Sequence, residues 1–286
     1  MTTASVTSAR RMRVRIKTRG FGVKRASRRV AERVDTVFGR SLRMMSLRGP
    51  KRTVGVVGIY REAQPIAALV EELSSSRHDV VFRLGAMGDI ATELRDETSH
   101  AHLTAGKFQN LNVLTESLAD VDWLLIIDDD VIVPRHFLDQ AIELCERLDL
   151  SLAQPAQTRL SNANWPLTKR RFLTIARDTQ FVEIGPVTLI RADAMRKLLP
   201  FPTDLRYGWG LDFEWAQVMT DSKMRMGVID SLAVIHASRA VASTYSWDAA
   251  QKEGQEYLRG VPHLPKDVAE GNGLRFHRTI PRPVTR

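Results

Sequence analysis

Three consecutive aspartates follow one of the most apolar stretches of the chain. Residues 123–127 read WLLII, and Asp128, Asp129 and Asp130 come directly after them. Three like charges at the end of a buried strand repel one another unless a cation lies among them. Mg²⁺ and Mn²⁺ prefer carboxylate oxygens and keep open positions for a diphosphate. The triplet therefore predicts a metal site, although a solvated acidic turn before a helix that Pro134 opens would have the same sequence.

The spacing of the first and third aspartates is informative by itself. Side chains two residues apart in an extended segment point to the same side, so Asp128 and Asp130 can face one ligand together. The element that must position them is the apolar stretch before them, which has the length and composition of a strand.

Strand and helix patterns alternate along the first half of the chain. An apolar run at 53–60 (TVGVVGIY) is typical of a strand buried on both faces. The patterns after it predict strands at 79–84 and 123–127 and helices at 64–74, 107–117 and 134–147. This alternation predicts an α/β fold with a mostly parallel sheet, whose ligands lie at the carboxyl ends of the strands. The aspartates stand at such an end.

The second half of the chain is less regular. Its patterns predict a helix at 211–220 and strands at 151–154, 181–184 and 187–191, with a strand pair between 226 and 236. A loop with Asn162, Asn164 and Trp165 separates the first two of these strands. Beyond residue 240 the chain is polar and contains Pro and Gly, and we expect a tail there.

Three further residues could do chemistry in this half. Glu183 lies in the apolar segment FVEI, so either an arginine pairs with it or it faces a ligand, because burying an unpaired carboxylate costs free energy. His236 ends an apolar run and is either a satisfied structural residue or a metal ligand acting with the aspartates. Trp209 lies between Gly208 and Gly210 and either packs in the core or stacks on a ligand.

The order of these motifs resembles the GT-A glycosyltransferases, which have a D-x-D at a strand end, a later acidic site that opens a helix, and a histidine that ends a late strand. A closer likeness is to a domain family of unassigned function that is grouped with the glycosyltransferases. Its F-V-E-I, G-W-G-L-D and G-V-V-D-S-x-x-x-x-H blocks correspond to residues 181–184, 208–212 and 227–236 here. The resemblance covers residues 53–238 and implies a GT-A fold with a small second antiparallel sheet.

The resemblance also implies roles in a metal-dependent sugar transfer from a nucleoside diphosphate sugar. Asp130, Asp128 and His236 would bind Mn²⁺ or Mg²⁺, which stabilises the leaving diphosphate as a Lewis acid. Asp212 would be the catalytic base of an inverting enzyme, because a carboxylate at a helix N-terminus stays ionised and can take the acceptor's proton. Many relatives have Glu where this chain has Leu211, so Glu214 is our second candidate for the base.

The donor site implied by the resemblance contains eight positions. Arg61 and Lys107 either offset phosphate charge or are surface cations. The other expected donor contacts are Tyr60, Asn110, Asp128, Asp129, Glu183 and Trp209. UDP is the donor carrier that the resemblance favours, and the acceptor is a glycan, a lipid-linked molecule or a small molecule.

The distribution of charge along the chain indicates how it is divided into regions. The 286 residues are 43% hydrophobic and 26% charged, with a formal net charge of +9. Residues 1–50 hold 14 Lys and Arg against two Asp and Glu, which leaves a charge of −3 for the rest. We therefore expect a basic extension at 1–50, a catalytic domain at 51–240 and a tail at 241–286 that helps form the acceptor site.

The basic extension has a helical apolar pattern over residues 22–45. A narrow apolar stripe flanked by arginines fits the surface of an anionic membrane, but a basic tail or a helix packed on its own domain is equally consistent with it. Cys145 is the only cysteine, and neither a transmembrane segment nor a signal peptide is apparent. We expect a cytoplasmic enzyme, peripheral to the inner face of the membrane, without a specific nucleic-acid partner.

Two other functions fit parts of the sequence. A phosphatase or phosphotransferase of the haloacid-dehalogenase type would use Asp128 as nucleophile and Asp130 as acid and base, but that motif normally ends the first strand of its domain. A non-catalytic adaptor for membranes or nucleic acid would act through the basic extension alone.

Overall fold

The computed structural model describes residues 49–118, 120–158, 161, 165–236, 246–269, 271 and 274–280. All of these residues belong to one unit, Met45–Arg286. The predicted helix over 22–45 lies outside the described residues, as do Asn162 and Asn164. None of the helices that the structure describes is long and apolar enough to cross a membrane.

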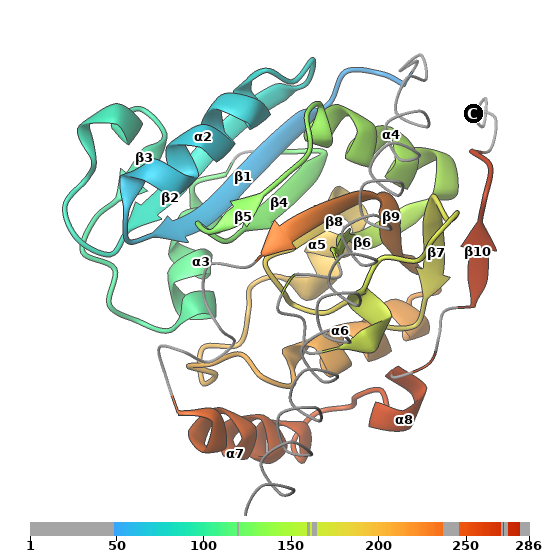
Figure 1. Ribbon diagram of the computed structural model, residues 1–286. Helices are drawn as coiled ribbons and strands as arrows, with labels where there is room; N and C mark the ends of the chain where they lie inside the picture. Colours follow the sequence, from blue (N-terminus) through green and yellow to red (C-terminus); the bar gives the residue numbers. More distant parts are fainter. Residues whose placement is uncertain are drawn as a thin grey trace, which may run out of the picture. The chain divides into compact units, whose positions relative to one another are not determined.

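The described residues form a ten-stranded sheet with the order β10-β7-β9-β6-β8-β4-β1-β2-β3, and β5 pairs with β9 outside this path (Figure 1). The strands are β1 (Thr53–Tyr60), β2 (Asp79–Ala86), β3 (Thr98–His100), β4 (Trp123–Ile127), β5 (Val131–Ile132), β6 (Leu150–Gln157), β7 (Ala176–Thr179), β8 (Val187–Arg191), β9 (Arg225–His236) and β10 (Arg275–His277).

One half of the sheet is parallel, and the other is mixed. Strands β3, β2, β1 and β4 run parallel to one another. Strand β8 runs antiparallel to β4 and β6, β6 runs parallel to β9, and β7 and β10 add an antiparallel edge. The short antiparallel pair of β5 with the end of β9 is the small second sheet. The predicted α/β class, with a mostly parallel sheet core, is confirmed.

Helices cover both faces of the sheet. The α-helices are α2 (Ala63–Ser74), α3 (Lys107–Glu116), α4 (Phe137–Leu148), α5 (Ala192–Leu198), α6 (Leu211–Asp221), α7 (Trp247–Leu258) and α8 (Lys266–Ala269), and the 3-10 helices are η1 (Thr92–Leu94) and η2 (Pro166–Thr168). Helices α2 and α4 contact each other, whereas α3, α5 and α6 contribute to a single apolar cluster.

Successive side chains of β4 point to opposite faces of the sheet, so this strand packs against the helices on both faces. Leu124 and Ile126 belong to the cluster with α3, α5 and α6. Trp123 points to the opposite face, and its indole nitrogen lies 3.5 Å from Oε1 of Glu146 in α4. Because both faces are covered, every residue of β4 is buried and the strand needs no polar side chain before Asp128.

Two predicted strands differ from the structure for reasons that concern buried polar groups. No strand spans 181–184, since the backbone nitrogen of Glu183 donates to the side chain of Gln154 at 2.5 Å instead of joining a ladder. Strand β7 lies earlier in the sequence, and its charged residues Arg177 and Asp178 do not fit the apolar pattern of a buried strand. The predicted strand pair at 226–236 is one strand, β9, because Asp230 is buried in mid-strand and does not mark a turn.

Arg177 and Asp230 form a fully buried ion pair that joins β7 to β9. The Nε atom of Arg177 donates to Oδ2 of Asp230 at 2.8 Å, and both side chains are 0% exposed. The backbone nitrogen of Arg171 also donates to Oδ1 of Asp230 at 2.7 Å. Burial raises the pKa of Asp230, and Arg177 only partly opposes that shift. The carboxylate therefore depends on these partners to stay charged.

We expect Arg177→Met or Asp230→Asn to lower the free energy of unfolding by about 3–5 kcal/mol, because each leaves a buried group without its partner. Urea denaturation of the variants measures this loss. The exposed pair of Lys51 and Asp79 is the control, and Lys51→Ala should cost less than about 1 kcal/mol. A loss of similar size in both pairs would show that burial does not determine the contribution.

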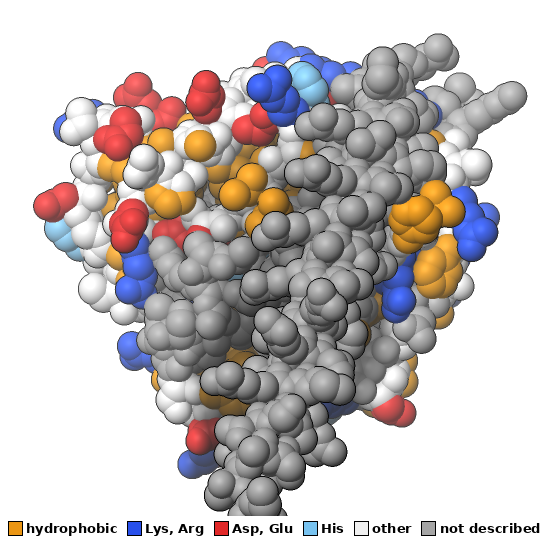
Figure 2. All heavy atoms as spheres, viewed as in Figure 1, with side chains coloured by type: hydrophobic (Ala, Val, Ile, Leu, Met, Phe, Trp, Pro, Cys, Tyr) orange, Lys and Arg blue, Asp and Glu red, His pale blue; other side chains and the backbone are white. Residues whose placement is uncertain are grey.

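Charges of both signs are scattered over the described surface. Figure 2 shows acidic and basic side chains on the same face of the molecule. The mixture of signs among the visible side chains fits the charge of −3 for residues 51–286.

Candidate functional site

A short β-ribbon brings together residues that are far apart in the sequence. The backbone nitrogen of Asp128 donates to the carbonyl oxygen of Pro186 at 2.8 Å, where β4 ends. The chain then turns through Asp130 into β5, and Val131 pairs with His236 at the end of β9. The pairing of β5 with β9 therefore places the third aspartate beside the late histidine.

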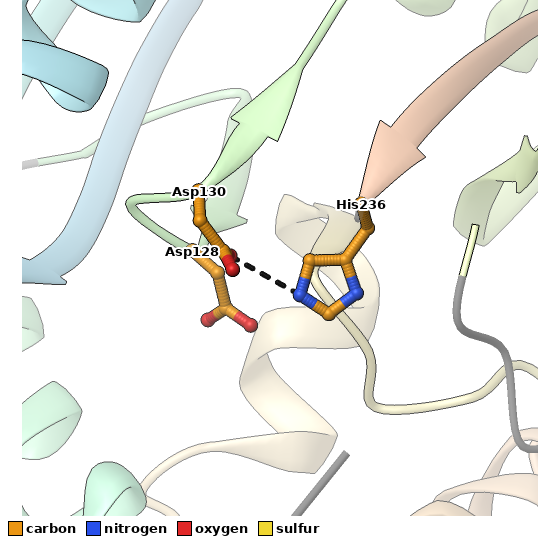
Figure 3. Close-up of side chains that lie close together, drawn as sticks. All are labelled: Asp128, Asp130 and His236. Carbon is orange, nitrogen blue, oxygen red and sulfur yellow. Dashed lines mark ion pairs between the residues drawn. The ribbon is translucent and has the colours of Figure 1, made fainter. Parts of the chain in front are cut away.

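The side chains of Asp128, Asp130 and His236 point toward one another (Figure 3). The Nε2 atom of His236 lies 3.1 Å from Oδ1 of Asp130. One ligand atom from each of the three residues lies within 4.8 Å of the other two. The structure thus gathers the three predicted metal ligands around one point.

The donor set of this cluster fits a divalent ion. Two carboxylates and one imidazole give oxygen and nitrogen ligands, and the imidazole favours Mn²⁺ over Mg²⁺, which prefers oxygen ligands. The Nδ1 atom of His236 is buried and has no hydrogen-bond partner among the described residues. The ring is therefore not a fully satisfied structural residue.

The protonation of His236 follows from its neighbours. Burial lowers its pKa, but the hydrogen bond and charge of Asp130 outweigh this effect, and the net shift is upward. A proton on the ring thus stabilises the contact between His236 and Asp130. A divalent ion would compete with that proton, because metal-bound imidazole is neutral.

The other two aspartates have different partners. Lys107 at the start of α3 places Nζ 2.6 Å from Oδ1 of Asp128. Asp129 is buried, and its Oδ2 accepts a hydrogen bond at 3.1 Å from the backbone nitrogen of Arg61, just after β1. The middle aspartate therefore ties the end of β1 to the turn, while its two neighbours face the cluster and Lys107.

A cleft of about 880 Å³ extends from this cluster. Its volume lies in the range of small-molecule sites. The lining includes ten of the twelve predicted site residues, namely Arg61, Lys107, Asn110, Asp128, Asp129, Asp130, Glu183, Trp209, Asp212 and His236. Asn110 is 4% exposed, and its side-chain nitrogen donates to the carbonyl oxygen of Ala105 at 2.9 Å, which orders the loop before α3.

Tyr60 and Glu214 are not among the residues that line the cleft. Tyr60 is 2% exposed, and its hydroxyl lies 3.0 Å from Oγ1 of Thr98 in the core. Glu214 accepts a hydrogen bond from the hydroxyl of Tyr257 in α7. The structure therefore gives Tyr60 a packing position and directs Glu214 to the contact between α6 and α7.

Asp212 reaches the cleft from the first turn of α6. Gly210 precedes the helix with φ of 96°, a left-handed conformation that favours glycine. The Oδ1 atom of Asp212 accepts a hydrogen bond from the backbone nitrogen of Phe213 at 3.1 Å. The turn thus fixes the carboxyl group at the wall of the cleft.

The N-terminal position in α6 does not by itself keep the pKa of Asp212 low. Burial, followed by the negative charge of Glu183, raises the pKa of Asp212 to about 8. The hydrogen bond from Phe213 opposes this shift but is too weak to cancel it. Loss of solvent therefore outweighs the favourable helix N-terminus.

Glu183 is held at the cleft wall by two glutamines of β6. Its backbone nitrogen donates to Gln154, and its Oε2 accepts a hydrogen bond from Nε2 of Gln157 at 3.2 Å. The side chain is 7% exposed and lines the cleft. Glu183 therefore lies at the wall of the cleft and is bonded to strand β6.

One wall of the cleft comes from a helix that the sequence analysis did not predict. Helix α7 contributes Trp247, Gln251, Gly254, Gln255 and Leu258 to the lining. Its sequence is polar, and the available signal was its N-cap, Ser246, whose hydroxyl accepts from the backbone nitrogen of Ala249 at 3.3 Å.

Solved glycosyltransferase structures share this fold. The mannosyltransferase PcManGT from Pyrobaculum calidifontis, in complex with GDP-Man and Mn²⁺, aligns with 86% of this chain and 76% of its own, at 13% identity and a TM-score of 0.55. GalNAc-T7 with UDP, GalNAc and Mn²⁺ aligns with 67% of this chain and 44% of its own, at 10% identity and a TM-score of 0.51. S. aureus TarS with UDP-GlcNAc aligns with 68% and 62%, at 13% identity and a TM-score of 0.51.

These alignments show the fold, and the chain has the GT-A architecture. It spans less than two thirds of the length of GalNAc-T7 and of the TarS structure. No protein family and no curated protein matches the sequence. The closer likeness to the family of unassigned function therefore remains a resemblance of short motifs.

Proposed function

We propose that this chain is a metal-dependent glycosyltransferase that transfers a sugar from a nucleoside diphosphate sugar to an acceptor hydroxyl. The observation that carries the proposal is the convergence of Asp130 and His236 from β5 and β9 in a cleft that also contains Asp212. The GT-A fold supports it, because the solved neighbours hold nucleotide ligands, two of them with Mn²⁺.

Asp130, Asp128 and His236 would hold the metal in this proposal. A divalent ion there would supply Lewis-acid stabilisation of the departing diphosphate. Lys107 and Arg61 line the same part of the cleft, and their cationic groups would bind phosphate oxygens. The ammonium group of Lys107 lies against Asp128, beside the proposed metal cluster.

Asp212 is the proposed catalytic base. The acceptor hydroxyl attacks the anomeric carbon as its proton moves to the Asp212 carboxylate. The bond between the anomeric carbon and the diphosphate oxygen breaks in the same step, so the nucleoside diphosphate leaves and the configuration is inverted. The position at the cleft wall supports this role, as does a pKa near the pH at which a base is efficient. Asn110, Asp129 and Trp209 complete the proposed donor site, and Asp128 and Glu183 would contact the donor's sugar.

We propose UDP as the donor carrier, because two of the three neighbours hold UDP or UDP-GlcNAc. GDP is the alternative, since the mannosyltransferase holds GDP-Man. A thermal-shift panel of nucleoside diphosphates with and without Mn²⁺ tests the class, because a ligand of the native state stabilises it by mass action. Stabilisation by one diphosphate only when Mn²⁺ is present supports the proposal, and its absence across the panel contradicts it.

The pH dependence of turnover tests the role of Asp212. The base must be ionised, and in the free enzyme its ionised fraction rises with pH up to about 8. We therefore expect kcat/KM to increase about tenfold per pH unit on the acid side and to level off above that pKa. Glu183→Gln removes the negative charge that raises this pKa, so the midpoint should move to lower pH. A profile that is flat through neutral pH would contradict a base with this raised pKa.

The phosphatase alternative makes the opposite prediction about substrates. Its nucleophile motif normally ends the first strand of the domain, whereas Asp128 here follows β4 in the middle of the sheet. Release of phosphate from simple phosphate esters, without any requirement for a nucleotide sugar, would favour that alternative.

We also propose a cytoplasmic enzyme that binds the inner membrane surface through residues 22–45. The arginine-flanked apolar pattern of that segment and the single cysteine support this placement. If the protein were instead an adaptor, deletion of residues 1–50 would abolish its function while Asp130→Ala would leave it intact. Sedimentation with anionic vesicles, before and after the deletion, measures the membrane contribution separately from turnover.

A further inference from the structure

Helix α7 presents one uncharged face to the cleft. Trp247, Gln251 and Gln255 recur at four-residue steps, so they lie on one side of the helix, and all three are exposed and line the cleft. The charged residues of the helix, Asp248, Lys252, Glu253 and Glu256, are not among the lining residues. The helix therefore contributes an indole and two carboxamides to this wall.

Helix α7 is fixed against the segment that leads to Asp212. The Glu253 carboxylate accepts hydrogen bonds from the backbone nitrogens of Arg206 at 2.9 Å and Tyr207 at 2.8 Å. A Cβ atom at Gly254 would lie 2.8 Å from the backbone oxygen of Trp209, so only glycine allows this close approach. The α7 wall and the proposed base thus belong to one rigidly connected part of the site.

Two tryptophans meet where α7 joins this segment. The ring centroids of Trp209 and Trp247 are 4.5 Å apart with perpendicular planes. Trp247 is nevertheless 46% exposed and lines the cleft. A large aromatic side chain that is held in place and left half-exposed at a cleft wall is typical of a ligand contact.

The mixture of side chains on this wall identifies the chemistry of its ligand. An indole surface packs against the CH groups of a ring, and carboxamides both donate to and accept from hydroxyl groups. A lipid tail would need a continuous apolar surface, and the two glutamines interrupt it. Sugar rings have both an apolar face and many hydroxyl groups, so they match this wall best.

We propose that the acceptor is a saccharide whose ring binds against Trp247, Gln251 and Gln255 and presents a hydroxyl to Asp212. The inference rests on the proposed function, because it assigns the substrate class of the same site. Arg206, His263 and Lys266 also line this end of the cleft. The saccharide can therefore be neutral or carry a carboxylate, and the experiment below separates these two cases.

The experiment measures nucleoside diphosphate release from the nucleotide sugar that gives the largest Mn²⁺-dependent thermal shift. The candidate acceptors are methyl glycosides of neutral hexoses and N-acetylhexosamines, methyl glycosides of uronic acids, a long-chain alcohol and a short serine-containing peptide. We expect at least one glycoside class to accelerate nucleoside diphosphate release by the wild-type enzyme. The comparison of neutral with acidic glycosides shows whether the basic side chains that line the cleft contact the acceptor.

The variants Trp247→Ala and Gln251→Ala/Gln255→Ala then locate the binding site. Each should raise KM for the active glycoside about tenfold or more with a smaller change in kcat, because a lost stacking or hydrogen-bonding contact of about 1.4 kcal/mol weakens binding by that factor. Trp247→Phe should restore most of the affinity. Phe276→Ala is the matched control, since Phe276 is an aromatic residue of β10 that is 44% exposed and does not line the cleft.

Three results would overturn the inference. The first is that only the alcohol or the peptide accelerates nucleoside diphosphate release. The second is that no acceptor class accelerates it although the nucleotide binds in the presence of Mn²⁺. The third is that the KM for the glycoside is unchanged in both folded α7 variants. Thermal melting of each variant verifies that it is folded. If no nucleoside diphosphate stabilises the wild-type protein in the presence of Mn²⁺, the proposed function fails as well, and that outcome is seen before any acceptor is added.

Discussion

Asp130→Asn should lower the Mn²⁺-dependent turnover of the nucleotide sugar by about 10³-fold. The carboxylate of Asp130 lies beside His236 in the proposed metal cluster, and asparagine keeps its size but removes its charge. A bound metal contributes several kcal/mol of charge stabilisation in the transition state, and each 1.36 kcal/mol is a factor of ten in rate. Nucleoside diphosphate release at several Mn²⁺ concentrations measures both the lost rate and any recovery at high metal.

Asp79→Asn is the matched control for this variant. Asp79 starts β2, pairs with Lys51 at 2.6 Å on the surface and does not line the cleft. The control removes the same charge from the start of β2, which β1 separates from β4, so a field effect of net charge would appear in both variants. If Asp130→Asn retained nearly full activity, Asp130 could not be a metal ligand.

Asp212→Asn is the second change with a large expected effect. Removal of a general base costs about 10²–10⁴-fold in rate, and we expect a loss in kcat with little change in the affinity for nucleoside diphosphate and Mn²⁺. Single-turnover sugar transfer, together with a separate binding measurement, distinguishes these two quantities. Equal loss of binding and rate would indicate a structural role for Asp212 instead.

The neighbouring carboxylate provides the comparison for the base. Glu214 is two residues further along α6 but bonds to Tyr257 and does not line the cleft. Glu214→Gln should therefore reduce kcat far less than Asp212→Asn. A larger loss in the Glu214 variant would transfer the role of base to Glu214.

Stability measurements exclude misfolding as the cause of lost activity in Asp212→Asn. The pKa of Asp212 is raised from its usual value to about 8, so the contribution of this group to stability is fully present in acid and is lost as pH rises toward 8. At and above that pH, asparagine avoids the cost of an ionised carboxyl at this position. We therefore expect the variant to be at least as stable as the wild type at weakly alkaline pH.

Local patterns in the sequence predicted the strands and helices that carry the D-x-D site. The bounds of β1, β4 and β8 agree with the structure. Strands β1 and β4 were recognisable because they are nearly continuous apolar runs that are buried on both faces. Strand β7 was missed because Arg177 and Asp178 resemble surface residues. Only the three-dimensional structure shows that Asp230 neutralises the buried Arg177.

The site residues were predictable where a short motif is typical of one kind of chemistry. They were not predictable where burial determines the pKa of a side chain. The aspartates and His236 stood out as residues, but the β5 to β9 pairing that joins them has no local sequence signal. The pKa of Asp212 depends on Glu183, which follows a different strand, and on loss of solvent. Helix α7 was missed because an amphipathic pattern with two glutamines and one tryptophan toward a cleft does not resemble a core helix.

The most direct test of the account is the position of Mn²⁺ in crystals of the protein grown with Mn²⁺ and a nucleoside diphosphate. We predict an anomalous scattering peak within bonding distance of a carboxylate oxygen of Asp130 and a ring nitrogen of His236, with diphosphate oxygens on its open side. A bound nucleotide without a metal peak at these residues, or a peak elsewhere in the cleft, would contradict the central claim.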